Sequence, residues 1–197
     1  MTDVKINIHI EKNIPIAAGL AGGSTDGAGT IFGLNYLFEA LDNKEMNELC
    51  ASLGSDLNVC LNGGCTLATS RGEVTKKLPC AEYPVTLIKP KNLGISAKEA
   101  YTKYALKKFK PKYEMTEKMF VALLDNEDIT KFLYNDLESA VFEDYNELQE
   151  IKNAIPDAIM SGSGSTYFVL KDLDIDLGEE YQVIRGLSFI PTGTEVM

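Results

Sequence analysis

The chain contains no tryptophan and a single histidine among its 197 residues. Its four cysteines are Cys50, Cys60, Cys65 and Cys80, and no two of them form a C-x-x-C pair. Zinc sites normally draw on such pairs or on several histidines, so we expect no zinc site. A disulfide framework is typical of small secreted domains, so we do not expect one here. We expect reduced thiols in a cytoplasmic protein.

Positive charge is also scarce, because 19 Lys and Arg stand against 29 Asp and Glu and give a net charge of −10. Nucleic acid and anionic membranes require a broad basic surface, so we expect neither as a partner. No apolar run approaches the roughly 20 residues of a membrane-spanning helix, and the first residues show no signal-peptide pattern. A small phosphate ligand stays compatible, because backbone amides bind phosphate without net positive charge.

The hydropathy pattern predicts an α+β fold. Apolar residues at alternate positions predict a strand over residues 4–10. Apolar residues three and four positions apart predict helices over about 25–41 and 46–53, the second ended by Gly54. Further extended segments are predicted at residues 57–61, 65–69, 85–88, 166–170 and 183–190.

The predicted secondary structure changes near residues 90–95, from short extended segments to a mostly helical pattern. Ser96 and Glu99 have the spacing of a capping box, which predicts that a helix begins there. From this point to about residue 156 the pattern is mostly helical. We therefore predict two α+β domains, covering residues 1–92 and 93–197.

A glycine-rich loop between the first strand and the first helix is the most informative stretch of the sequence. Gly19, Gly22 and Gly23 stand among small alanines, so few side-chain atoms obstruct the backbone where it would wrap around a phosphate. A helix that begins near Ser24 would direct its N-terminal amides at the same place. The hydroxyls of Ser24 and Thr25 can cap the helix, bind a phosphate oxygen or ligate magnesium. A glycine-rich turn without a ligand is the alternative, since neither common nucleotide-binding motif is matched.

Two further segments contain candidate functional residues. Asp56 follows the second helix, where a carboxylate can orient a substrate hydroxyl and take its proton during phosphoryl transfer. The alternative is that Asp56 only caps a turn. A third glycine run, over residues 160–166, predicts a tight loop or a hairpin turn.

Together these three segments resemble motifs of the galactokinase, homoserine kinase, mevalonate kinase and phosphomevalonate kinase (GHMP) superfamily. The segments are PIAAGLAGGSTD, GSDLNVCLNGGCTLATSRGE and MSGSGSTYF. Within the superfamily they are most similar to the branch that phosphorylates the 2-hydroxyl of diphosphocytidyl methylerythritol, in the non-mevalonate isoprenoid pathway. The resemblance implies a ribosomal protein S5-like N-terminal domain and a ferredoxin-like C-terminal domain, with ATP and Mg²⁺ as cofactors and a monomer or weak homodimer.

The resemblance also assigns roles to residues. It makes Asp56 the catalytic base, stacks Tyr101 on the cytosine ring of the substrate and places residues 161–164 beside the active cleft. Ser24 is the expected magnesium ligand, and Lys12 is either near the nucleotide or simply solvated. The loop expected to hold the triphosphate of ATP consists of Pro15, Ile16, Ala17, Ala18, Gly19, Leu20, Ala21, Gly22, Gly23, Ser24 and Thr25.

Two departures from the family pattern stand out. Asn58 replaces the proline of the family's G-x-D-V-P motif. Lys5-Ile6-Asn7-Ile8 mimics the family's lysine-bearing first strand but directly precedes the glycine loop. We therefore expect that the chain is N-terminally truncated and lacks that strand and its lysine. The competing hypotheses are a catalytically defective nucleotide-binding remnant and another GHMP kinase that acts on a different alcohol.

Overall fold

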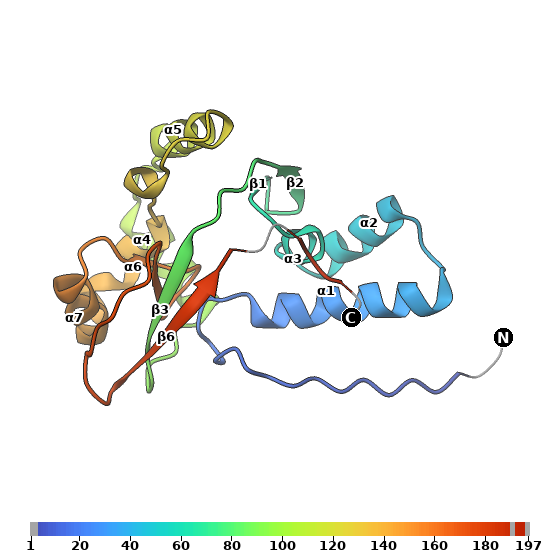
Figure 1. The fold of residues 1–197 in the computed structure, drawn as a ribbon, viewed down its shortest axis with the longest axis horizontal. Coiled ribbons are helices and arrows are strands. Elements are labelled where there is room, and N and C mark those ends of the chain that lie inside the picture. The colour runs from blue at the N-terminus through green and yellow to red at the C-terminus, as the bar shows by residue number, and fades with distance from the viewer. Residues whose placement is uncertain (1–3, 190–191, 196–197) are drawn as a thin grey trace.

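The computed structural model describes residues 4–189 and 192–195, and within them it has an α+β fold, as the sequence predicts. Figure 1 shows three helices and a small hairpin on one side and a sheet with the remaining helices on the other. None of the described helices combines the length and the apolar character that a membrane span requires. The helices are α1 (Gly22–Phe38), α2 (Asn43–Leu53), α3 (Leu57–Asn62), α4 (Ala97–Lys107), α5 (Tyr113–Leu124), α6 (Asp136–Val141) and α7 (Asn146–Ala154).

Helices α1, α2 and α3 pack around one small core. Helix α2 begins at a capping box, in which the Asp42 carboxylate accepts from the Glu45 amide at 2.8 Å and the Glu45 carboxylate accepts from the Asp42 amide at 2.9 Å. These bonds satisfy two amides that a helix start leaves without partners. The core residues that the three helices share are Ala28, Ile31, Met46, Cys50, Leu57 and Leu61.

Two predictions for this part of the chain are wrong. Residues 57–61 form α3 and not a strand, because Leu57 and Leu61 lie four positions apart and both face the core. Residues 4–10 form no strand in the described structure and are exposed. The first helix begins at Gly22 and ends at Phe38, which is three residues earlier at each end than predicted.

The second half is built on a four-stranded antiparallel sheet of order β4-β5-β3-β6. Its strands are β3 (Pro84–Pro90), β4 (Ile159–Met160), β5 (Tyr167–Val169) and β6 (Tyr181–Ser188). The predicted extended segments at 85–88, 166–170 and 183–190 correspond to β3, β5 and β6, although Ile190 lies outside the described residues. The predicted helix start at Ser96 is confirmed, because its side chain accepts from the Glu99 amide at 3.1 Å.

The main core of the second half lies between the sheet and helices α4, α6 and α7. Ile88, Leu148, Ile151 and Tyr167 are completely buried in it. Strand β3 precedes residue 92 but occupies a central place in this sheet. The division into domains at residue 92 stays a prediction.

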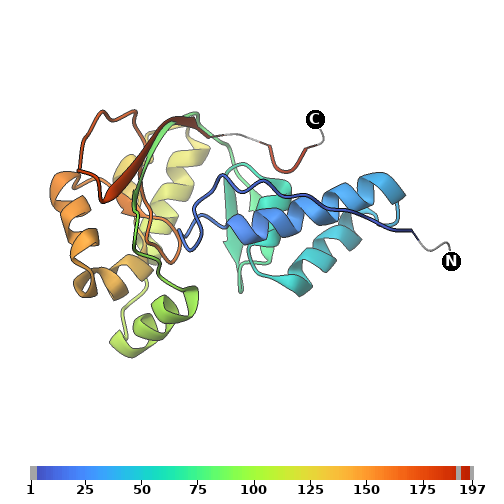
Figure 2. The same cartoon turned by 90° about the horizontal axis from the view of Figure 1, so that it is seen from below.

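A small hairpin and the C-terminal segment connect the two halves. The hairpin pairs β1 (Thr66–Thr69), which the sequence predicts, with β2 (Val74–Lys77), which it does not. After β6 the chain returns to α3, where the Thr194 amide donates to the Leu61 carbonyl at 3.3 Å. Figure 2 shows this return beside α3 from below.

Candidate functional site

The glycine loop borders a cavity of about 470 Å³ at the N-terminus of α1. No side chain caps this helix, and the Thr25 amide makes its first internal bond, to the Ala21 carbonyl at 2.9 Å. The amides of Gly22, Gly23 and Ser24 therefore form no hydrogen bond with another described residue. Free amides at a helix N-terminus, together with the helix dipole, form a binding site for an anion.

The backbone around these amides is open. A Cβ atom added at Gly23 would meet nothing within 4 Å, so this side of the first turn faces free space. Ala17 and Ala21 adopt left-handed backbone conformations, with φ of 52° and 51°. Such conformations cost an L-residue about 1–2 kcal/mol, and local strain of this kind gathers at ligand-binding loops.

The two hydroxyls of the loop differ in availability, and neither caps the helix, which was one of the three roles that the sequence left open for them. Thr25 Oγ1 donates to the Ala21 carbonyl at 3.2 Å and lies 3.6 Å from the Cys60 sulfur, and Thr25 does not line the cavity. Ser24 is half-buried and lines the cavity. The donor set for a ligand at this site therefore contains Ser24 but not Thr25. Of the eleven predicted loop residues, the cavity brings together Pro15, Ile16, Ala17, Ala18, Gly19, Leu20, Ala21, Gly22, Gly23 and Ser24.

Lys12 brings a positive charge to the edge of this cavity. Its Nζ forms an ion pair with Asp26 at 2.5 Å and lies 3.4 Å from the position of a Cβ at Gly22. The Lys12 side chain is 37% exposed, so it can exchange Asp26 for an incoming anion without a large rearrangement. Lys12 thus lies beside the glycine loop and is also exposed to solvent, and its contact with a nucleotide stays a prediction.

The third glycine run packs directly against the glycine loop. Ser161 Oγ donates to the Gly19 carbonyl at 2.9 Å, and the Thr166 amide donates to the Ala18 carbonyl at 3.2 Å. Gly19 has a φ of +72°, and a Cβ at this position would lie 2.2 Å from the Ser161 carbonyl oxygen. Only glycine fits this contact. The run also forms the β4–β5 hairpin, so the two alternatives offered for it both apply.

Asp56 lies just before α3 and is exposed. Its side chain does not cap the helix, and it does not line the glycine-loop cavity. The pKa of the Cys60 thiol on α3 is raised by burial and, to a lesser extent, by the Asp56 carboxylate. The Thr25 hydroxyl acts against this increase. The carboxylate is thus near the first turn of α1 but outside the cavity.

Asn58 shows what replaces the proline of the family pattern. It is buried, and its Nδ2 donates to the Glu73 carbonyl at 2.9 Å. This bond ties α3 to the turn between β1 and β2, and a proline has no side-chain donor that could form it.

Tyr101 projects from α4 and is 62% exposed. It does not line the glycine-loop cavity. The segment before α4 does approach the loop, since a Cβ at Gly94 would lie 3.1 Å from the Ala17 Cβ. The structure therefore places the segment before α4, at Gly94, but not Tyr101 itself, against the glycine loop.

A buried lysine, Lys89, holds the segment that precedes α4. The sequence did not point to this residue as functional. Lys89 on β3 is 4% exposed, and its ammonium donates to the carbonyls of Pro90 and Leu93 at 2.6 Å and 2.5 Å. Burial lowers the pKa of Lys89. The Ser165 hydroxyl donates to the same Leu93 carbonyl at 2.5 Å, so β3 and the third glycine run both hold the chain at Leu93. The one signal in the sequence is a lysine inside the apolar run Val85–Pro90.

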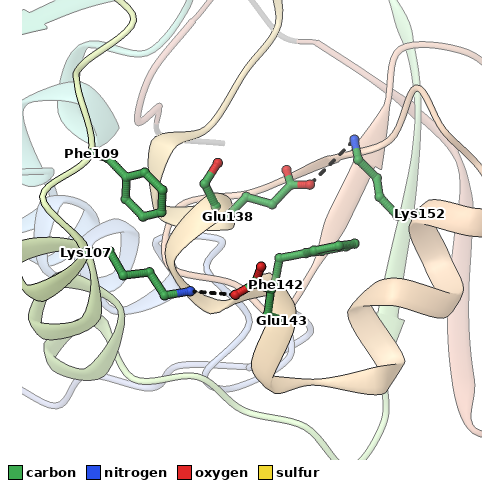
Figure 3. A pocket seen from close by; sticks show the side chains of 7 residues that line it. Lys107, Phe109, Glu138, Phe142, Glu143 and Lys152 are labelled. Carbon is green, nitrogen blue, oxygen red and sulfur yellow. Dashed lines mark hydrogen bonds and ion pairs between the residues drawn. The ribbon is translucent and has the colours of Figure 1, made fainter.

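A larger cavity, of about 590 Å³, lies in the second half (Figure 3). Its two lysines are both engaged, since Lys107 pairs with Glu143 at 3.4 Å and Lys152 with Glu138 at 3.5 Å. Lys152 also donates to the carbonyls of Pro156 and Ala158. With two carboxylates facing two cations, this cavity offers no excess positive charge to a phosphate, and the glycine loop is the better candidate site.

Comparison with known proteins identifies the family of the chain. A sequence profile described as the GHMP kinases N terminal domain matches residues 2–66. A 4-diphosphocytidyl-2-C-methyl-D-erythritol kinase of Synechococcus sp. is 40% identical, over 95% of this chain and 69% of its own length. The enzyme of the same name from Carboxydothermus hydrogenoformans is also 40% identical, over 84% of this chain and 60% of its own length.

A solved structure leads to the same group of proteins. The crystal structure of a 4-(cytidine 5'-diphospho)-2C-methyl-D-erythritol kinase superposes with a TM-score of 0.65 at 30% identity, over 81% of this chain and 59% of that one. The chain thus spans about 60–70% of the length of these relatives.

Proposed function

The chain belongs to the 4-diphosphocytidyl-2-C-methyl-D-erythritol kinase family of the GHMP kinases. From this membership we propose that it transfers the γ-phosphoryl group of ATP to the 2-hydroxyl of 4-diphosphocytidyl-2-C-methyl-D-erythritol. The observation that carries the proposal is the uncapped N-terminus of α1, where the amides of Gly22, Gly23 and Ser24 face the glycine-loop cavity. Phosphoryl transfer depends chiefly on positioning and on stabilisation of charge. A rigid row of amide donors provides both.

In this proposal the glycine loop holds the triphosphate of ATP. The helix dipole and the three amides bind the phosphate oxygens, and Lys12 supplies the positive charge at the edge of the cavity. The contacts of Gly19 with the third glycine run keep the loop in shape before the nucleotide arrives. Pre-organisation of this kind reduces the cost of binding.

The donor set near the loop also fits a magnesium ion that bridges phosphate oxygens. Mg²⁺ is usually held by one or two protein oxygens together with substrate phosphates, and Ser24 offers one hydroxyl oxygen inside the cavity. When bound, the ion neutralises charge on the transferring phosphoryl group. Asp26 lies on the same turn of α1, and its carboxylate becomes free for the ion only when Lys12 exchanges it for a phosphate.

Asp56 is the residue that we propose orients the hydroxyl and accepts its proton. The hydroxyl oxygen forms a bond to the γ-phosphorus, the bond from that phosphorus to the bridging oxygen breaks, ADP leaves and the proton passes to the carboxylate. Asp56 lies outside the glycine-loop cavity, and its carboxylate is close enough to Cys60, which contacts Thr25 on the first turn of α1, to raise the pKa of the Cys60 thiol. Tyr101, which is 62% exposed, has a ring face free to stack on a cytosine ring.

An isotope-transfer assay tests the proposal. The 197-residue chain is incubated with γ-labelled Mg-ATP and the alcohol, and the labelled product is measured for the wild type, Asp56→Asn and Asp157→Asn. Asp157 pairs with Lys171 on the surface and serves as the matched control. We expect product with the wild type and the control, and a loss of roughly 100-fold or more in turnover with Asp56→Asn, typical of a removed general base.

The assay also separates the proposal from its alternatives. Folded wild-type protein that binds ATP without transfer would favour a nucleotide-binding module. Transfer to homoserine or mevalonate instead would favour another GHMP kinase. Transfer that survives Asp56→Asn would remove Asp56 from the mechanism. We further infer that a protein that uses ATP in this way works in the cytoplasm.

A further inference from the structure

The carbonyl oxygen of Leu93 accepts hydrogen bonds from two buried side chains. Leu93 lies between β3 and α4, and the Lys89 ammonium on β3 donates to its carbonyl at 2.5 Å. The Ser165 hydroxyl, in the third glycine run, donates to the same oxygen at 2.5 Å. A carbonyl oxygen has two lone pairs, so both donors can bind it at once. One backbone atom thus joins β3, the segment before α4 and the third glycine run.

Lys89 occupies its buried place without a charged partner. No described carboxylate pairs with its ammonium, which donates to the carbonyls of Pro90 and Leu93. Burial of an unpaired charge lowers stability, even when hydrogen bonds reduce the penalty. A methionine would fill a similar space without that penalty. Packing therefore does not account for a lysine here, whereas the two carbonyls that it fixes require a donor.

Two short routes connect the Leu93 carbonyl to the glycine loop. Gly94, the next residue, packs on the loop so closely that a Cβ there would lie 3.1 Å from the Ala17 Cβ. On the other route, Thr166 follows the serine that binds Leu93, and its amide donates to the Ala18 carbonyl at 3.2 Å. A shift of Leu93 would therefore move Ala17 and Ala18, which line the glycine-loop cavity.

The Leu93 carbonyl is also connected to α4. Ile95, two residues later, is 1% exposed in the main core of the second half. Ser96 then caps α4 by accepting from the Glu99 amide at 3.1 Å. No flexible linker separates Leu93 from the helix that carries Tyr101, so the position of Leu93 sets where α4 begins.

We propose that Lys89 is a positioning residue for phosphoryl transfer. Through the Leu93 carbonyl it holds the glycine loop and α4 in one fixed relation, so that the hydroxyl of the alcohol lies in line with the γ-phosphorus of ATP. This inference rests on the proposed function, and Lys89 is too buried to contact either substrate itself.

Loss of Lys89 should disturb alignment more than nucleotide binding. The amides at the start of α1 belong to the helix and would still bind phosphate. With the acceptor less well aligned, water competes for the γ-phosphoryl group. A water oxygen then bonds to the γ-phosphorus, the bond from that phosphorus to the bridging oxygen breaks, and ADP, inorganic phosphate and a proton are released.

The test compares the ADP formed with the phosphorylated alcohol formed, in the whole 197-residue chain. This ratio does not depend on how much of a variant is folded, so a merely structural role would not change it. The wild type should form the two in equal amounts. Lys89→Met should lower kcat roughly tenfold, leave KM for ATP near that of the wild type and form more ADP than product. Ser165→Ala removes the other donor to Leu93 and should shift the ratio in the same direction.

Thr86→Val is the matched control on the same strand. Thr86 is completely buried on β3, and its hydroxyl donates to the Lys171 carbonyl at 2.8 Å and accepts from the Leu173 amide at 3.0 Å. The valine removes buried hydrogen bonds that do not involve Leu93, so the protein should be less stable but form ADP and product in equal amounts. Equal amounts with Lys89→Met, or the same excess of ADP with Thr86→Val, would overturn the proposal.

Amide hydrogen exchange tests the same connection without any substrate. Lys89→Met should speed exchange at the Thr166 amide, which donates to the Ala18 carbonyl, and leave the Ile155 amide at the end of α7 as in the wild type. Equal acceleration at both amides, or none at Thr166, would overturn the proposal. If the wild type transfers no phosphoryl group, the proposed function fails, and this exchange result alone decides whether Lys89 holds the glycine loop.

Discussion

The hydroxyl of Thr25 lies 3.6 Å from the sulfur of Cys60 and donates to it, which joins the first turn of α1 to α3. Four residues before Cys60 is Asp56, whose carboxylate is close enough to raise the pKa of the Cys60 thiol. The pKa of the Cys60 thiol is therefore sensitive both to Thr25, at the end of the glycine loop, and to Asp56, the proposed base. Its ionisation responds to both neighbours, and in opposite directions.

Substitutions at Asp56 and Thr25 should shift the pKa of the Cys60 thiol in opposite directions. Burial is the main reason why the pKa of Cys60 is raised, the Asp56 charge adds to it, and the Thr25 hydrogen bond lowers it. Asp56→Asn should therefore lower the pKa and speed alkylation of Cys60 at a fixed pH below it, whereas Thr25→Val should raise the pKa and slow it. The measurement is the alkylation rate of the peptide that contains Cys60, followed by mass spectrometry.

Asp157→Asn is the control for the thiol measurement, because it removes the same charge far from Cys60 in the sequence and from a pair with Lys171. Its alkylation rate should match the wild type. If both Asp56→Asn and Thr25→Val moved the rate in the same direction, the relationship between these three side chains would be wrong.

A pair of glycines on α1 tests the glycine loop. Gly23 and Gly29 both have free space around an added Cβ, and both are helical with ordinary backbone conformations. Gly23→Ala would place its methyl group in front of the free amides, so we expect ATP binding to weaken at least tenfold. Gly29→Ala lies two turns further along the helix and should bind ATP as the wild type does. Isothermal titration calorimetry with Mg-ATP measures both.

The two alanine variants should share one further property. Each replaces glycine by the best helix former, so neither should lower thermal stability. Weak ATP binding by Gly23→Ala in a protein that melts at or above the wild-type temperature would then reflect loss of the binding surface. Equal binding by the two variants would place the phosphate elsewhere.

Lys12 should contribute to nucleotide binding through its charge. Lys12→Ala removes the cation that lies near Gly22 and leaves Asp26, a negative charge, beside the first turn of α1. We expect ATP affinity to fall by about tenfold at low salt and the difference from the wild type to narrow as salt is added. Lys44→Ala removes an exposed lysine of α2 that pairs with Glu48, and its affinity should not change. A loss that does not depend on salt would point to packing and not to charge.

Lys89 should make the stability of the fold depend on pH. Burial lowers its pKa in the folded state, so in the interval between that pKa and the ordinary value the unfolded chain binds the extra proton. Stability therefore rises with pH across this interval. Lys89→Met removes the titrating group. The free energy of unfolding of the wild type, measured relative to that of the variant, should therefore increase as pH rises towards about 10.5.

Chemical denaturation at a series of alkaline pH values measures the Lys89 effect as a difference between the two proteins. Tyrosines whose pKa values are raised, such as Tyr167 and Tyr181, titrate in both proteins and cancel. The neighbouring Lys91 is exposed, and Lys91→Met should show no such difference. A constant gap between wild type and Lys89→Met at every pH would contradict the assignment.

Much of the fold follows from local patterns in the sequence. Helix α2 ends at Leu53, as its apolar stripe and Gly54 predict, but it begins at Asn43, three residues before the predicted start, because a capping box at Asp42 extends it. Residues 57–61 were assigned wrongly, because in five residues the spacing of Leu57 and Leu61 fits a strand and one turn of a helix equally well. Only the contact of α3 with α1 selects the helix. The alternation over 4–10 predicted a strand wrongly, because a strand needs a neighbour to pair with, and local sequence does not specify one.

The candidate site was predictable to the extent that it is local. The glycine loop could be found because bare backbone, small residues and a following helix are adjacent in the sequence. Its contacts with Ser161 and Thr166 could not, since they join segments that no periodicity relates. Lys89 was missed for the same reason. Its role depends on the carbonyl of Leu93, which is directed at it only by the turn after β3.

The contact between Ser161 and Gly19 joins residues that are 142 positions apart in the chain. During synthesis the glycine loop leaves the ribosome long before the segment that holds it. Until residues 161–166 emerge, Gly19 and Ala18 have only their own neighbours, and closure of so long a loop carries an entropic cost. A nascent chain should therefore form α1 early and acquire the ability to bind nucleotide late, when most of its length has been made.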